Sequence, residues 1–198
     1  AASPAWAQAR KDKVIKRDRS VVEGSVRADK FSGVTVDATT IPADQVLRVE
    51  YSDAPPSFQS ALAAIDEGKW EDAVSGLKSA YHAVKEGEID ARTNRKVTWP
   101  CRPWFDQYYF FYLGYCERQL GRFDDALTRF NACREMKDGN PKEPSRLWAD
   151  AFEMSLECLR EKGDVDEMTK LVASIDAAPQ DLRAGLKKRA QKQQAELL

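Results

Sequence analysis

The pattern of apolar and polar residues changes near residue 55. Before this point, short runs rich in β-branched residues, such as "KVIKRD" and "SVVEGSVRAD", alternate with polar turns, a pattern typical of β-strands. From Pro55 onward, apolar residues recur at steps of three and four positions, which indicates amphipathic helices. We therefore predict an α+β protein, with a small antiparallel β-sheet or barrel over residues 11–53 and an all-α domain over residues 54–198.

Two residues mark irregular points in the predicted β module, residues 11–53. Gly24 interrupts the second strand run, and a residue without a Cβ atom favours a bulge or sharp bend. Pro42 cannot donate a backbone hydrogen bond, so we place it at a strand edge or at the start of a short helical turn over "PADQ". The rhythm of four or five short strands resembles the small SH3-like and Sm-like barrels. So small a sheet is expected to pack against the helices.

Glycines divide the second part of the chain into pairs of helices. Apolar positions on both sides of Gly68 fit two helices joined by a short turn, and the same arrangement returns around Gly121 and Gly163. The spacing therefore predicts three helical hairpins.

The stretch "LGYCERQLGRFDDALTRFNAC" resembles a tetratricopeptide repeat, a unit of about 34 residues that pairs two antiparallel helices. Small residues at Gly114 and Ala126 are expected to let the two helices approach closely. Glu117 departs from the family pattern, in which an aromatic residue is usual at this position. The residues at the family's signature positions are Phe110, Leu113, Gly114, Gly121, Phe123, Ala126, Phe130 and Cys133.

Two further units extend this resemblance over residues 55–179. "SFQSALAAIDEGKWEDAVSGLKSAYHA" precedes the central unit and "AFEMSLECLREKGDVDEMTKLVASIDAAP" follows it. The turn glycines lie farther apart than about 34 residues, so insertions interrupt the array. The first insertion contains "ARTNRKVTWPCRPW", in which Trp99 and Trp104 are expected to anchor it to the helices, and the second contains "KDGNPKEP". The final stretch, "PQDLRAGLKKRAQKQQAELL", is expected to form a helix that caps the last unit.

The resemblance implies a binding groove on the face made by the first helix of each unit. Aromatic residues and arginine contribute strongly to protein interfaces. In an alternative interpretation, Tyr108, Phe111 and Tyr115 pack against the first insertion or the β module. The partner-binding residues carried over from the family's groove positions are Tyr108, Phe111, Tyr115, Arg118, Gln119, Glu153, Glu157 and Arg160, with Asp150 and Glu161 beside them.

Charge and hydropathy narrow the class of partner. The 198 residues include 31 basic and 32 acidic side chains, for a formal net charge of −1, so no global field favours nucleic acid. The basic run "RKDKVIKRDR" is interrupted by Asp12 and Asp18, and we interpret it as a solvated strand face. No apolar run reaches the roughly 18–20 residues of a membrane-spanning helix. We therefore expect a protein or peptide partner, no nucleic acid and no membrane span.

The residue types that carry catalysis or bind metals form no recognisable set. Cys101, Cys116, Cys133 and Cys158 lack metal-ligand spacing, and we interpret the last three as small core residues. Whether any cysteines form disulfides stays open. His82 has no recognisable nucleophile or carboxylate poised beside it, so we expect it to be exposed or partly packed. We predict no metal, no cofactor and no enzymatic activity.

The first ten residues bear on location. "AWAQA" has the small-x-small form of a signal-peptidase site over residues 5–7. We interpret residues 1–10 as the remnant of a signal peptide or as a disordered end. The first interpretation places the protein in the periplasm of a bacterium or outside the cell, while a cytoplasmic location stays open.

These features together predict a non-catalytic scaffold or assembly factor that binds its partner through the concave face of helical repeats. Two other classes stay open. One is a structural envelope component that self-assembles. The other is an enzyme or small-ligand-binding protein with a site between the β module and residues 87–105.

Overall fold

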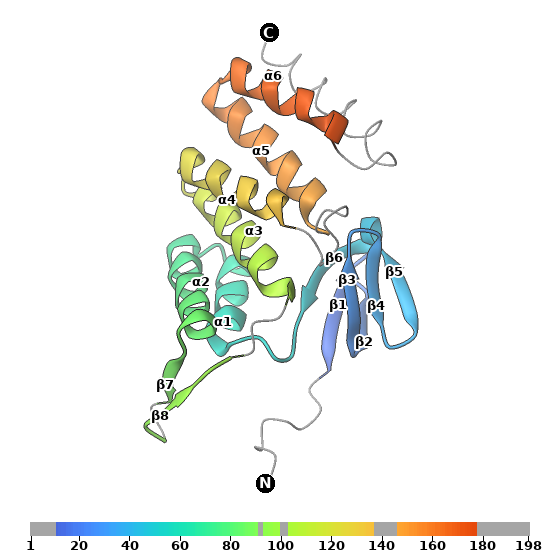
Figure 1. Cartoon of the computed structure of the whole chain (residues 1–198), viewed down its shortest axis with the longest axis vertical. Coiled ribbons are helices and arrows are strands. Elements are labelled where there is room, and N and C mark those ends of the chain that lie inside the picture. The colour runs from blue at the N-terminus through green and yellow to red at the C-terminus, as the bar shows by residue number, and fades with distance from the viewer. Residues whose placement is uncertain (1–10, 91–92, 100–102, 137–145, 178–198) are drawn as a thin grey trace.

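The structure, a computed structural model, describes residues 11–90, 93–99, 103–136 and 146–177. It contains antiparallel β-sheets followed by helices (Figure 1), so the predicted α+β class is confirmed. The interpretations of residues 1–10, Cys101 and the C-terminal capping helix fall outside the described residues.

The strands of the β module are β1 (Asp12–Lys16), β2 (Val21–Gly24), β3 (Val26–Lys30), β4 (Gly33–Val36), β5 (Thr39–Pro42) and β6 (Val46–Glu50), with the 3₁₀ helix η2 (Ala43–Gln45) before β6. The helices are α1 (Pro56–Asp66), α2 (Trp70–Lys85), α3 (Pro103–Gln119), α4 (Phe123–Glu135), α5 (Trp148–Lys162) and α6 (Val165–Ala173), followed by the 3₁₀ helix η3 (Ser174–Ala177).

The β module consists of two three-stranded sheets, with strand orders β2-β1-β6 and β3-β4-β5. Alternation along the strands buries Val14 and Val49 of the first sheet and Val34, Val36 and Ile41 of the second in one common core. Among the described residues the two sheets share no backbone ladder. The strands therefore do not close into a barrel, although the sequence allowed one.

The predicted irregular points of the β module are both found in the structure. The chain passes from the first sheet to the second just after Gly24, where an added Cβ would lie 2.4 Å from Oδ2 of Asp37 and 2.5 Å from Cγ1 of Val36. Pro42 ends the edge strand β5 and is followed at once by η2. The interruption of the strand run at Gly24 and the short helical turn after Pro42 are thus confirmed.

The described helices form three pairs whose turns share one geometry. Gly68, Gly121 and Gly163 have φ angles of 73°, 73° and 71°, in the left-handed region that glycine tolerates. Each glycine N–H donates to the carbonyl three residues earlier, and the next N–H donates to the carbonyl five residues before it. This is the Schellman pattern that ends many helices. The predicted glycine turns are therefore confirmed at all three positions.

The central pair approaches closely at Gly114, as predicted. A Cβ added there would lie 3.0 Å from Cε1 of Phe130 and 3.1 Å from Cβ of Arg129. Ala126 and Phe130 are completely buried between the helices. The small residue on α3 therefore provides the space that the Phe130 ring fills.

Glu117, the residue that departs from the repeat pattern, is buried on α3. Its residue surface is 4% exposed, and its Oε2 lies 3.6 Å from Nε of Arg129. Burial raises the pKa of the Glu117 carboxyl, and the nearby charge of Arg129 offsets this only in part.

Replacing Glu117 with glutamine is expected to raise the free energy of unfolding at pH 7. Because the pKa of Glu117 is higher in the folded protein than in the unfolded chain, its contribution is fully present below the unfolded pKa and is lost as pH rises through the folded pKa. Glutamine removes that loss, so the gain in the free energy of unfolding should be largest at pH 7 and smallest near about pH 4. Urea denaturation of the variant and of the wild type across this pH range measures the gain. Glu135→Gln, at an exposed position of α4, is the control, and an E117Q variant no more stable than wild type at pH 7 contradicts the expectation.

The helices pack in chain order, α2 against α3 and α4 against α5. Figure 1 shows this succession from α1 to α6, with the β module alongside. One hydrophobic cluster joins the β module to α1–α4 and part of α5. A second cluster lies between α5 and α6, around Trp148, Phe152 and Met168.

The first insertion contains a β-hairpin that the sequence did not reveal. Strands β7 (Glu88–Asp90) and β8 (Arg95–Val97) pair antiparallel and extend away from the end of α2 (Figure 1). Asn94 lies in the turn with a φ of 51°, and the Trp99 indole donates a hydrogen bond of 2.7 Å to Oε1 of Glu88. Strands of three residues carry too little alternation to be recognised.

The described cysteines are core residues, as predicted. Cys116, Cys133 and Cys158 are completely buried on α3, α4 and α5, and none forms a disulfide. Burial raises the pKa of the Cys116 and Cys158 thiols to about 12. Both thiols therefore stay protonated and contribute mainly through packing.

Candidate functional site

The β module lies on the face of the helices formed by α1, α3 and α5, called here the first-helix face. Arg48 of β6 binds Asp66 of α1, and Tyr51, just after β6, stacks on Trp104 of α3. Arg17, just after β1, forms an ion pair of 3.5 Å with Asp150 of α5. The chain therefore covers part of the face on which the sequence placed a partner.

A buried polar network fixes the β module to this face. Asp29 of β3 accepts hydrogen bonds of 2.7 Å from the hydroxyls of Tyr51 and Tyr108, both on Oδ2. Its Oδ1 accepts from Nε of Arg146, just before α5, at 2.6 Å. The Arg146 and Asp29 side chains are only 2% and 5% exposed. Because both oxygens of Asp29 are satisfied by three separate donors, the carboxylate can remain charged inside the protein.

The electrostatics of this network favour one protonation state. Burial raises the pKa of the Tyr51 and Tyr108 hydroxyls far above their usual range, so both remain donors. For Arg146, burial acts to lower the pKa, but the neighbouring Tyr108 and Asp29 outweigh it and the pKa is raised. The network is thus a fixed structural joint between the β module and the helices.

Aromatic packing supports the same joint. The rings of Tyr51 and Trp104 stack with centroids 4.0 Å apart and planes 3° from parallel. Tyr108 meets both rings edge-on at 5.7 Å, and Phe58 of α1 meets Trp104 at 5.8 Å. Trp104 therefore anchors the start of α3 to the β module as well as to the neighbouring helix, which is more than the sequence predicted.

The structure disperses the predicted groove residues of α3. Tyr108 is completely buried against the β module, so the alternative interpretation holds for this residue and it is not available to a partner. Phe111 packs on Phe130 with ring centroids 6.0 Å apart, and Tyr115 lies 5.9 Å from the ring of Trp70 on α2. Phe111 and Tyr115 therefore pack largely against neighbouring helices.

The charged groove residues are brought together across α3 and α5. Nη2 of Arg118 lies 3.1 Å from Oε2 of Glu157 and 2.5 Å from Oε1 of Glu161. Glu153 and Arg160 are half-buried on α5, and Gln119 is exposed at the end of α3. The predicted residues therefore form an ion-paired surface in which Arg118 is already bound to two carboxylates.

A cleft opens nearby, between α1 and the first sheet of the β module. Its volume is about 690 Å³, within the range of ligand-binding pockets. The sequence allowed a small-ligand site between the β module and residues 87–105, but none of the residues that line this cleft belongs to the described part of residues 87–105. The residues that line the cleft are Lys11, Lys13, Glu23, Arg48, Glu50, Tyr51, Ser52, Ala54, Phe58, Gln59, Leu62, Ala63 and Asp66.

The sheet wall of the cleft follows from strand alternation. Lys13 of β1 pairs in register with Glu23 of β2 and with Glu50 of β6, so these three side chains form a row on the side opposite the buried Val14 and Val49. The row holds one positive and two negative side chains, so by itself it carries a formal charge of −1. The opposite wall, on α1, contributes the buried apolar side chains of Phe58 and Leu62.

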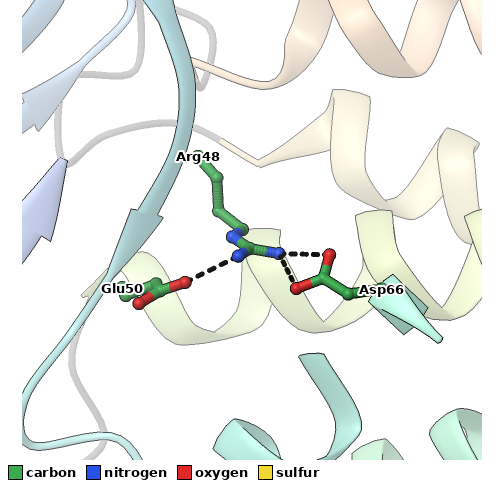
Figure 2. Close-up of polar contacts among 3 residues, drawn as sticks. All are labelled: Arg48, Glu50 and Asp66. Carbon is green, nitrogen blue, oxygen red and sulfur yellow. Dashed lines mark hydrogen bonds and ion pairs between the residues drawn. The ribbon is translucent and has the colours of Figure 1, made fainter. Parts of the chain in front are cut away.

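Arg48 bridges the two walls of the cleft (Figure 2). Its Nη1 donates to both carboxylate oxygens of Asp66 at 2.9 and 3.1 Å, and its Nη2 donates to Oε1 of Glu50 at 2.7 Å. Burial acts to lower the pKa of Arg48, but the bond to Asp66 and the neighbouring charges outweigh it, and the pKa is raised. The guanidinium is therefore a permanent positive charge in the wall, with an Nε that is buried and has no hydrogen-bond partner.

The sequence contained a partial signal for this cleft. Arg48 and Glu50 alternate with buried Val49 on β6, which places both charges on one outer face. Nothing in the local pattern shows that α1 lies across from them. The position of Asp66, 18 residues later, depends on how the whole β module packs.

Other candidate chemistry is limited in the part of the chain that the structure describes. His82 is exposed, as predicted, but the carboxylate of Glu86, four residues later, lies 3.3 Å from its Nδ1, so the expectation that no carboxylate lies beside it was wrong. Among the described residues, no group of three or more His, Cys, Asp or Glu side chains is placed to hold a metal ion. No described helix is long and apolar enough to cross a membrane.

Comparison with known proteins places the chain in no family. It matches no protein-family model, and a search of curated proteins finds no match. The geometry of the first-helix face and of its cleft is therefore the guide to function.

Proposed function

We propose that the protein is a non-catalytic interaction scaffold or assembly factor that binds a segment of a partner protein on its first-helix face. The observation that carries this proposal is the cleft of about 690 Å³ between α1 and the outer side of the sheet β2-β1-β6. Compared with the groove predicted on α3 and α5, the binding position shifts to the first helix pair. This shift follows from the β module, which covers Tyr108.

The three helix pairs support the underlying repeat interpretation. Their turns repeat the same hydrogen bonds and the same left-handed glycine, as expected of one unit of about 34 residues that recurs with insertions. In tetratricopeptide-like arrays, the first helices form the concave binding surface. The proposed site on α1 lies on the corresponding face.

The lining of the cleft supports a peptide-like ligand. Phe58 and Leu62 offer apolar contacts, and charged side chains of both signs surround them. A peptide segment combines these features, because its backbone is polar while individual side chains are apolar or charged. An apolar centre with a polar rim is also the usual composition of a protein interface.

Filling the cleft is expected to weaken partner binding strongly. Ala63 lines the cleft from an exposed position on α1, so Ala63→Trp adds a bulky ring there without disturbing the core. We expect A63W to bind the partner at least about tenfold more weakly than wild type. The partner is first recovered by affinity capture from the source cells, and direct affinity is then measured with both purified proteins.

Ser79→Trp is the matched control for this test. Ser79 is exposed on α2 and is not part of the cleft, so S79W should bind like wild type. Equal affinity of A63W and wild type for the purified partner would reject the cleft as the binding position.

A further inference from the structure

We infer that the cleft recognises an acidic side chain of the bound segment, whose carboxylate takes the place of Asp66 on Arg48. This inference rests on the proposed function, and it adds the chemical class of the ligand. The one-to-one exchange of carboxylates at a fixed guanidinium is the step that makes the site selective.

Arg48 is the fixed member of the pair. Its side chain is 19% exposed and is held from its own strand by Glu50, at 2.7 Å. Its guanidinium offers a planar fork that matches a carboxylate, and it remains charged at any physiological pH. A ligand carboxylate therefore meets a donor that is already oriented in the wall of the cleft (Figure 2).

Asp66 is the replaceable member of the pair. It is the last residue of α1, and its side chain is 56% exposed. An exposed ion pair contributes little to stability, since water solvates the separated charges well. Asp66 can thus turn to solvent when another carboxylate binds Arg48, with little loss of stability.

The charges of the lining agree with this exchange. The described lining contains three cationic side chains, Lys11, Lys13 and Arg48, and three anionic ones, Glu23, Glu50 and Asp66. When Asp66 turns away, the cleft retains one positive charge in excess. A ligand with one carboxylate restores neutrality, whereas a basic ligand would add to the excess.

The apolar side chains of the α1 wall indicate which residues of the ligand lie next to its acidic residue. Phe58 and Leu62 line the same cleft from α1, as Asp66 does. A segment with its carboxylate on Arg48 can place a neighbouring apolar side chain against these residues. The expected ligand class is therefore a peptide segment in which an acidic residue is flanked by large aliphatic residues.

Blocked pentapeptides test this class directly. The probes are acetyl-ALELA-amide and its counterparts with glutamine or lysine in the centre, titrated into the full chain by calorimetry. The acidic probe should bind at least about tenfold more tightly than either counterpart, because hydrogen bonds to a charged group are the strong ones. Ala63→Trp should abolish its binding, which locates it in the cleft.

Variants of the two exchange partners complete the test. Asp66→Asn removes the internal competitor and should tighten binding of the acidic probe by about two- to fivefold, the range of an exposed ion pair. Glu67→Gln makes the same charge change at the adjacent residue, which pairs with Lys69, and should leave affinity unchanged. Arg48→Lys keeps the positive charge but not the planar fork of donors. It should lower the affinity for the acidic probe toward the affinity for the glutamine probe.

The outcomes separate this inference from the proposed function. Equal binding of the three probes in the cleft would overturn acidic recognition while leaving a peptide-binding cleft intact. Absence of binding by the acidic probe would also overturn the inference, and partner binding by A63W would then decide the proposed function separately. A D66N variant that binds no better than E67Q would reject the exchange with Asp66.

Discussion

Replacing Arg146 with methionine is expected to lower the free energy of unfolding by about 3–5 kcal/mol. The substitution leaves the carboxylate of Asp29 buried without its cationic partner, although the hydroxyls of Tyr51 and Tyr108 remain as donors. A buried charge that loses its counter-ion carries nearly the whole desolvation penalty. Urea denaturation, followed by tryptophan fluorescence and by circular dichroism, measures the loss.

The control for this prediction is an arginine in the same interface that is exposed. Arg17 pairs with Asp150 at 3.5 Å, with side chains 54% and 35% exposed, so Arg17→Met should cost less than about 1 kcal/mol. The double variant Asp29→Asn/Arg146→Met removes both charges and should recover part of the stability lost in R146M. Equal losses in R146M and R17M would show that the buried network does not hold the β module in place.

The second large effect is expected for Phe58→Ala, a loss of about 3–5 kcal/mol. Phe58 is 2% exposed, and its ring meets Trp104, Phe105 and Tyr112 at centroid distances of 5.8, 5.6 and 6.3 Å. Truncation would leave a cavity where α1 meets α3, next to the cleft. Thermal and urea denaturation give the change in stability.

Phe58→Leu is the matched variant for this site. It retains most of the buried volume and should cost about 1.5 kcal/mol or less. A large gap between F58A and F58L indicates that packing at this position stabilises the joint. Similar small losses of stability in both variants would mean that the α1 wall of the cleft is not a rigid part of the core.

The helical part of the fold was predictable because its determinants are local. Gly68, Gly121 and Gly163 end their helices through hydrogen bonds that span at most five residues, so a short window of sequence contains the whole signal. The strand interruption at Gly24 and the helical turn after Pro42 are local for the same reason. The hairpin formed by β7 and β8 was missed because three-residue strands with mostly charged side chains lack a readable alternation.

The position of the β module on the helices was not predictable from the same signals. Asp29 and Arg146 are 117 residues apart, and Asp29 and Tyr108 are 79 apart, so no local pattern links them. A groove position carried over from the repeat family assumes an open face. That assumption fails at Tyr108, where the β module supplies the neighbour.

The candidate site also combines a local feature that the sequence reveals with a packing feature that it does not. The alternation of Arg48, Val49 and Glu50 along β6 places two charges on one outer face, and this much could be read from the sequence. The bond from Arg48 to Asp66 requires α1 to lie across from that face. The cleft is therefore a product of the packing between two parts of the chain, each of which is separately predictable.

Site-specific photo-crosslinking tests most directly where the partner binds. A benzophenone amino acid is placed at Glu23, an exposed residue that lines the cleft from the edge strand β2, or at Gln119, an exposed residue of the groove predicted from the sequence. After irradiation with the partner, we expect a covalent adduct from position 23 and none from position 119. An adduct from position 119 alone would place the partner on α3 and α5 and contradict the cleft as the binding site.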